Sequence, residues 1–239
     1  MKFAVFSDIH ANLTALQACY KHYLQVNTEA KIVVLGDYID YGARPNETIA
    51  FIKDMSPYLI INGNHEKGLS GSEDVRFSLQ RVVAASKLTR RLLNEDSLDF
   101  VKKHNYAKYE KVCEGRSILF VHGDLYDEYW GRMPLHEMER SAYSKYDFVI
   151  SGHTHIPHFV EMFYPNDDVT RRNKMKTCFI NSGSVGQPRN HCKYAQYAVF
   201  DTETEEVHFF KVDYDITLEQ SFFTDEFDVF YKERLSFGV

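Results

Sequence analysis

The stretch KIVVLGDYIDYG, residues 31–42, decides the fold class that the sequence predicts. Its apolar run IVVL stops at Gly36, and two carboxylates, Asp37 and Asp40, follow at once. A short run rich in β-branched residues and closed by glycine is typical of a buried strand in a mostly parallel sheet. Open α/β sheets place their active sites at the carboxyl ends of such strands. Taken alone, the Gly-Asp pair also fits a plain turn whose aspartate caps the next helix.

The same pattern recurs at two other apolar runs near the N-terminus. Residues 2–7 lead into Asp8 and His10, and residues 58–62 lead into Gly63-Asn64-His65-Glu66. A carboxylate and an imidazole two residues apart in an extended segment can point to the same side. Chance explains one polar junction of this kind easily and three poorly, so we interpret all three as parts of one site.

Two later apolar runs end in histidines. Residues 117–121 precede His122-Gly123-Asp124, and residues 147–151 precede Gly152-His153-Thr154-His155. Histidine is seldom buried without a partner, and two charged rings this close would repel each other. Imidazole together with carboxylate oxygen suits a borderline divalent ion such as Mn, Fe or Zn better than Ca or Mg. The sequence therefore predicts that Asp37 lies between two metal ions.

The segments between and after these runs predict the other elements. Asn12 is placed to cap a first helix and Pro45 to open a second. The length of 239 residues suits a single domain, 1–239, in which residues from about 72 to 104 form a charged helical insertion. From His158 onward the pattern predicts an antiparallel half. Its strands are expected at residues 159–163, 175–180, 194–201 and 207–214, and a terminal helix at 227–235.

Composition restricts the partners of the chain. A net charge of -6 and a pI near 6.0 argue against extended nucleic-acid binding, although bound metal ions would still permit a phosphate substrate. The four scattered cysteines indicate reduced thiols, and no apolar run is long enough for a membrane span or a signal peptide. We therefore expect a cytoplasmic protein without a membrane partner. The sequence leaves open whether it forms a homo-oligomer.

The polar motifs, taken as an ordered set, resemble those of the calcineurin-like metallophosphoesterases. All five blocks occur in the family order, and residues 181–189, NSGSVGQPR, look like a loop of the small bacterial and archaeal branch that includes phosphodiesterases of the YfcE type. The resemblance implies an α/β fold, a four-layer α/β/β/α sandwich of two facing mixed sheets. The blocks are Asp8-x-His10, Gly36-Asp37-x-x-Asp40, Gly63-Asn64-His65-Glu66, His122-Gly123 and Gly152-His153-Thr154-His155.

The resemblance also implies a role for each motif residue. Two divalent transition-metal ions are expected, Mn foremost, with Fe, Zn, Ni or Co as alternatives. A metal-bridging hydroxide would attack the phosphorus of a phosphate mono- or diester. His65 would be catalytic and face the leaving group or the phosphoryl oxygens, with Asp40 orienting it, and the Asn64 amide would also contact substrate. The first metal would be held by Asp8, His10 and His155, the second by Asn64, His122 and His153, and both by Asp37.

The chain departs from the protein serine/threonine phosphatase branch at one position. Tyr41 stands where that branch has an arginine, so we expect a small phosphorylated molecule or nucleotide as substrate rather than a phosphoprotein. Arg44 is a candidate phosphate ligand, although it equally fits an exposed loop, and Arg189 is a weaker candidate. Hydrolysis of dinucleoside polyphosphates is one alternative. Another is a non-catalytic scaffold of the same fold, but scaffolds of this kind tend to lose the motif residues that are present here.

Overall fold

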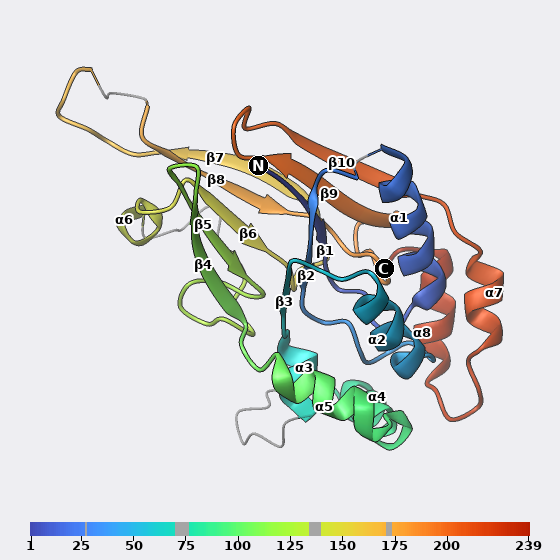
Figure 1. Cartoon of the computed structure of the whole chain (residues 1–239). Coiled ribbons are helices and arrows are strands. Elements are labelled where there is room, and N and C mark those ends of the chain that lie inside the picture. The colour runs from blue at the N-terminus through green and yellow to red at the C-terminus, as the bar shows by residue number, and fades with distance from the viewer. Residues whose placement is uncertain (27, 70–76, 134–139, 171–173) are drawn as a thin grey trace.

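In the computed structural model, which describes residues 1–26, 28–69, 77–133, 140–170 and 174–239, two five-stranded sheets face each other (Figure 1). The first sheet has the strand order β10-β9-β1-β2-β3. Its three N-terminal strands run parallel, and β9 pairs antiparallel with both β1 and β10. The strands are β1 (Lys2–Phe6), β2 (Lys31–Leu35), β3 (Leu59–Ile61), β9 (Ala195–Asp201) and β10 (Val207–Val212).

The second sheet is mixed as well and has the order β4-β5-β6-β8-β7. Strands β5, β6 and β8 run parallel, while β4 and β7 are antiparallel edge strands. The strands predicted to form one antiparallel half therefore do not form a single unit, because they divide between the two sheets. The strands are β4 (Lys108–Cys113), β5 (Arg116–Val121), β6 (Phe148–Ser151), β7 (His158–Phe163) and β8 (Lys176–Asn181).

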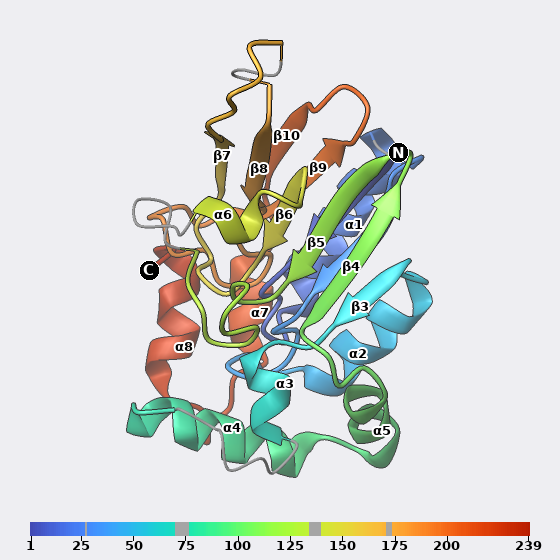
Figure 2. The ribbon, with the colours of Figure 1, turned by 90° about the vertical axis from the view of Figure 1, so that its left-hand side faces the viewer.

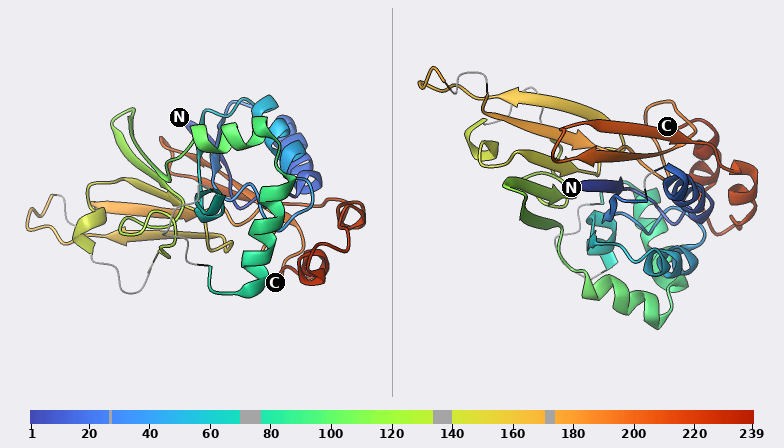
Figure 3. Two further views of the ribbon diagram at one scale, coloured as in Figure 1. Left: turned by 90° about the horizontal axis from the view of Figure 1, so that it is seen from below. Right: turned by 45° about the horizontal axis from the view of Figure 1, so that its top comes forward.

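Apolar residues fill three layers. The layer between the sheets is built from alternate residues of both, such as Phe3 and Val33 facing Phe120 and Ile150. Helices α1 (Leu13–Val26) and α2 (Pro45–Asp54) cover the outer face of the first sheet (Figure 3). The outer face of the second sheet carries the short α6 (Arg140–Tyr143) and an aromatic cluster. The predicted four-layer sandwich of two mixed sheets is thus confirmed.

Among the described residues of the segments 64–69 and 77–103, three helices lie at one end of the molecule, where Figure 2 shows α4 along its base. They are α3 (Asn64–Leu69), α4 (Gln80–Leu92) and α5 (Glu95–Lys103). Part of the predicted helical insertion, residues 72–76, lies outside the described residues. Asn94 caps α5, because its side chain accepts the Ser97 backbone N–H at 2.9 Å. The predicted cap Asn12 of α1 accepts the Ala15 N–H at 3.0 Å.

The C-terminal region returns to the end of the sheets that carries the polar loops. It contains α7 (Ile216–Ser221), α8 (Val229–Glu233) and a 3₁₀ turn (Arg234–Ser236). Tyr231 and Phe230 of α8 pack with Ala85 of α4 and with Tyr41. Among the described residues, no helix has both the length and the apolar character that crossing a bilayer requires.

Candidate metal centre

The loops after β1, β2 and β6 hold their polar side chains in an unusual backbone conformation. Five of the seven predicted metal ligands lie in the left-handed region, with φ between 48° and 62°. That conformation costs free energy for any residue other than glycine, and it concentrates at functional sites. Sequence gives no direct signal for it, because none of these residues is glycine. The five are Asp8, His10, Asp37, His153 and His155.

Glu66 fixes the strained loop that carries Asp37. Its buried carboxylate accepts the backbone N–H groups of Asp37 at 2.8 Å and Gly63 at 2.7 Å, and also those of Tyr38 and Ile39. A carboxylate that accepts four N–H groups replaces the hydrogen bonds that a regular strand or helix would supply. Glu66 belongs to a predicted motif, but no role was predicted for it. The sequence feature that could have indicated its role is an acidic residue three positions after Gly63.

Glycines permit the close approach of these loops. A Cβ atom on Gly63 would lie 2.1 Å from Asp37 Oδ1, and one on Gly36, which has φ +83°, would lie 2.6 Å from His122 Nδ1. Both positions are therefore closed to larger residues.

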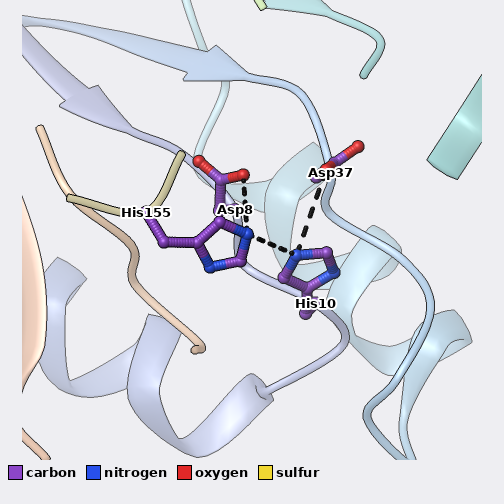
Figure 4. Close-up of side chains that lie close together, drawn as sticks. All are labelled: Asp8, His10, Asp37 and His155. Carbon is purple, nitrogen blue, oxygen red and sulfur yellow. Dashed lines mark hydrogen bonds and ion pairs between the residues drawn. The ribbon is translucent and has the colours of Figure 1, made fainter. Parts of the chain in front are cut away.

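The first predicted ligand group converges from three loops (Figure 4). His10 Nε2 lies 3.3 Å from His155 Nε2 and 4.0 Å from Asp37 Oδ2. Asp8 Oδ1 lies 3.2 Å from His155 Nε2, yet this buried oxygen accepts no hydrogen bond from the described residues. The structure thus brings together the oxygen and nitrogen donors that were predicted for the first metal.

The second group adjoins the first through Asp37. His122 Nε2 lies 3.2 Å from Asp37 Oδ2 and 3.2 Å from Asn64 Oδ1, and His153 Nδ1 lies 2.8 Å from the same Asn64 oxygen. Asp37 therefore belongs to both groups, one with Asp8, His10 and His155 and the other with His122 and His153.

Backbone carbonyls set the protonation of three histidines. The Nδ1 atoms of His10, His122 and His155 lie 3.0, 2.8 and 2.6 Å from the carbonyl oxygens of Ile39, Leu35 and Gln187. A carbonyl oxygen only accepts, so each Nδ1 carries a proton, and the neutral rings of His10 and His155 direct their Nε2 lone pairs into the site. Lone pairs of His10, His155 and the Asp8 carboxylate facing one another at 3.2–3.3 Å fit a shared cation.

The charge states of His10 and His155 agree with this arrangement. For His122, burial lowers the pKa, but the Asp37 carboxylate outweighs burial and raises the pKa to about 9. Burial, with the charge of His65, lowers the pKa of His10 well below its ordinary value, and burial with the charge of Arg189 does the same for His155. Burial would raise the pKa of Asp37, but the charges of His122 and His65 outweigh it and hold that pKa well below the usual range. Neutral imidazoles around an ionised carboxylate are the forms that bind a metal ion.

His65 lies beside the two groups rather than in either. Its Nδ1 is 2.7 Å from Asp40 Oδ2, and its Nε2 is 4.0 Å from Asp37 Oδ2. Burial lowers the pKa of His65, but the Asp37 and Asp40 carboxylates outweigh that effect and leave the pKa raised. The structure therefore places the predicted catalytic pair in contact, with Nε2 turned toward the site.

Another cluster with metal-ligand residue types lies elsewhere and is already occupied. Glu161, Cys178 and Glu205 lie close together, but the ammonium of Lys176 sits 2.5 Å from Glu161 and 2.6 Å from Glu205. The lysine supplies the positive charge that a metal ion would otherwise bring.

Arg44 makes its contacts away from the metal-ligand groups. Its guanidinium is paired with the fully buried Glu219 of α7, donates to Thr14 Oγ1 at 2.6 Å and lies 4.0 Å above the Phe222 ring. It is absent from the lining of the pocket over the metal-ligand groups. The structure favours neither the candidate phosphate contact nor an exposed loop arginine, because Glu219 pairs with the largely buried guanidinium.

Arg44→Ala is expected to lower the free energy of unfolding by about 3–5 kcal/mol, because it leaves the Glu219 carboxylate buried without its partner. Arg91→Ala, which removes an exposed pair with Glu226, should cost less than about 1 kcal/mol. Urea unfolding of both variants makes the comparison. Equal stabilities would contradict the structural role of Arg44.

The similarity of this chain to known proteins agrees with the geometry of the site. The model of the calcineurin-like phosphoesterase superfamily domain matches residues 1–205. The chain belongs to this superfamily. An uncharacterized protein of Methanocaldococcus jannaschii is 31% identical over 218 residues, which cover 89% of this chain and 88% of that protein. Residues 206–239, including Tyr231, follow the matched region.

Solved structures show the same fold. A metallophosphoesterase from Sphaerobacter thermophilus has a TM-score of 0.77 and 28% identity, covering 100% of this chain and 99% of that one. A hypothetical protein from Pyrococcus horikoshii has a TM-score of 0.83 at 19% identity, covering 100% and 98%. The predicted resemblance to the superfamily and to its small archaeal and bacterial members is confirmed.

Proposed function

We propose that this chain hydrolyses phosphate mono- or diesters of small molecules or nucleotides, using two divalent transition-metal ions. The observation that carries the proposal is the position of Asp37, whose carboxylate belongs to both ligand groups. Dinuclear centres with a shared ligand recur in enzymes that transfer phosphoryl groups to water. Mn is the first candidate ion, since mixed nitrogen and oxygen ligands accept Mn, Fe, Zn, Ni and Co alike.

Bound metal ions would supply Lewis acidity and a nucleophile at neutral pH. The chain supplies the remaining functions. Asn64 turns its oxygen toward His122 and His153, which leaves its amide N–H groups for a substrate oxygen. Such fixed donors stabilise charge that develops on the phosphoryl oxygens.

In this proposal, His65 donates a proton to the leaving group. Asp40 accepts from Nδ1 and favours the imidazolium, so Nε2 can donate a proton to the departing oxygen. Tyr41 limits the movement of this ring, since its centroid lies 4.5 Å from that of His65 and 4.6 Å from that of His10. Tyr231 stacks on Tyr41 with ring centroids 4.5 Å apart, so the C-terminal region helps to hold Tyr41 in place.

The proposal is tested by hydrolysis of p-nitrophenyl phosphate, bis-p-nitrophenyl phosphate and diadenosine tetraphosphate, each with Mn and with chelator. We expect Mn-dependent turnover of at least one, and the preferred substrate separates monoester, diester and dinucleoside polyphosphate hydrolysis. Protein that holds two metal ions and turns over none of the three would favour a non-catalytic scaffold.

A further inference from the structure

The pocket above the metal-ligand groups is lined in part by residues that have no role in the hydrolysis step itself. Its volume is about 270 Å³, slightly below the range of about 300–1,000 Å³ typical of small-molecule sites. Besides the motif residues and Tyr41, its lining includes the aromatic residues Phe77 and Trp130 and the arginines Arg132 and Arg189. A flat ring and an anionic group are the ligand features that such walls recognise.

The aromatic wall stands on the His65 side of the pocket. The Phe77 ring lies 5.0 Å from the His65 ring, inclined by 34°, and 5.2 Å from Trp130 in an edge-to-face contact. Trp130 in turn lies 6.5 Å from His153. Because His65 is placed to serve the leaving group, the aromatic wall borders the space that the leaving group fills.

The two arginines border different parts of the site. Arg132 lies two residues after Trp130 of the aromatic wall, and both line the pocket. Arg189 lies two residues after Gln187, whose carbonyl oxygen is 2.6 Å from His155 Nδ1 of the first ligand group. Arg132 therefore borders the aromatic side of the pocket and Arg189 the side of the first ligand group. Neither forms an ion pair with a residue that the structure describes, and the buried Nε of Arg189 has no hydrogen-bond partner there.

We propose that the leaving group is a nucleotide, whose base lies against Phe77 and Trp130 and whose own phosphate lies against Arg132. The inference rests on the proposed phosphoester hydrolysis. Base stacking on aromatic side chains and guanidinium contact with phosphate are both established modes of recognition. In the reaction, water adds its oxygen to phosphorus, the bond from phosphorus to the nucleotide oxygen breaks, and that oxygen takes one proton of the water. Arg189, the other arginine of the pocket lining, would contact the phosphoryl group under attack.

Binding of the product nucleotide tests this without turnover of a natural substrate. Trp130 is the only tryptophan in the chain, so its fluorescence in Mn-loaded protein reports contact with the aromatic wall. Adenosine monophosphate should change that fluorescence and compete with bis-p-nitrophenyl phosphate at least about tenfold better than adenosine or ribose 5-phosphate does. Equal inhibition by adenosine monophosphate and ribose 5-phosphate would overturn the inference.

Matched variants assign the two contacts. Arg132→Gln should weaken adenosine monophosphate about tenfold or more and leave adenosine unchanged, because it removes only the phosphate contact. Phe77→Leu should weaken both nucleoside ligands and leave ribose 5-phosphate unchanged. Arg91→Gln, which replaces an exposed arginine of α4, should change the affinity for none of the three ligands. Unaltered binding in both pocket variants contradicts the assignment.

Two substrates identify which oxygen of the nucleotide leaves. Adenosine diphosphate presents a phosphate oxygen, and a 5′-phosphorylated diadenylate presents a ribose oxygen. We expect kcat/KM for one of them to exceed that for bis-p-nitrophenyl phosphate at least about tenfold. If both fall below it while bis-p-nitrophenyl phosphate is hydrolysed, the nucleotide inference fails and the proposed function stands. If two-metal protein hydrolyses no phosphoester, the proposed function fails first.

Discussion

Asp37→Asn is expected to lower metal content and turnover together. The substitution removes the charge that both ligand groups share, while an asparagine oxygen can still accept the His65 backbone N–H, which donates to Asp37 Oδ1 at 3.0 Å. Changes to residues that merely orient metal ligands cost about 10–100-fold in affinity or activity, so loss of a shared ligand should cost more than about 100-fold. Metal analysis of the purified variant and its hydrolysis rate provide the measurement.

The matched control is Asp99→Asn, which alters an exposed carboxylate on α5 and should keep full metal content. Two bound ions and full activity in the Asp37 variant would reject the shared-ligand assignment. Loss of folding in that variant is recognised separately by its unfolding transition.

His65→Ala is expected to leave metal content nearly intact and to reduce turnover by about 10²–10⁴, the range typical of acid–base residues. The reason is geometric, since His65 contacts Asp40 through Nδ1 and keeps Nε2 4.0 Å from Asp37. Turnover and metal stoichiometry are measured on the same sample. An emptied metal site would show instead that His65 is a ligand.

A second substitution guards against a purely structural effect at His65. Alanine leaves the buried Asp40 carboxylate without its partner, which alone destabilises the protein. His65→Gln retains a donor for Asp40 but cannot donate a proton to a leaving group, so its turnover should fall as far as that of the alanine variant. His208→Ala, at an exposed position on β10, should behave as the wild-type protein does.

The ligands could be predicted from sequence because each follows a recognisable buried strand. Parallel strands carry their carboxyl ends to one edge, so separate Asp, Asn and His motifs converge without any contact being known. The structure brings all seven predicted ligands together for this reason. Their roles as ligands stay predictions until a metal is measured.

Features that depend on distant contacts could not be predicted. Arg44 fits an active-site loop in sequence, but its partner Glu219 lies 175 residues away. Phe77 and Trp130 meet only through the folding of separate loops. Strand β4 was missed because its sequence, KYEKVC, is an exposed edge with a buried residue only at its end.

The central claim is that two metal ions act together at Asp37. The most direct test is the hydrolysis of bis-p-nitrophenyl phosphate while metal-free protein is titrated with Mn and the bound metal is counted. We expect turnover to rise to a plateau at two ions per chain. A plateau at one ion, or turnover with no bound metal, would contradict it.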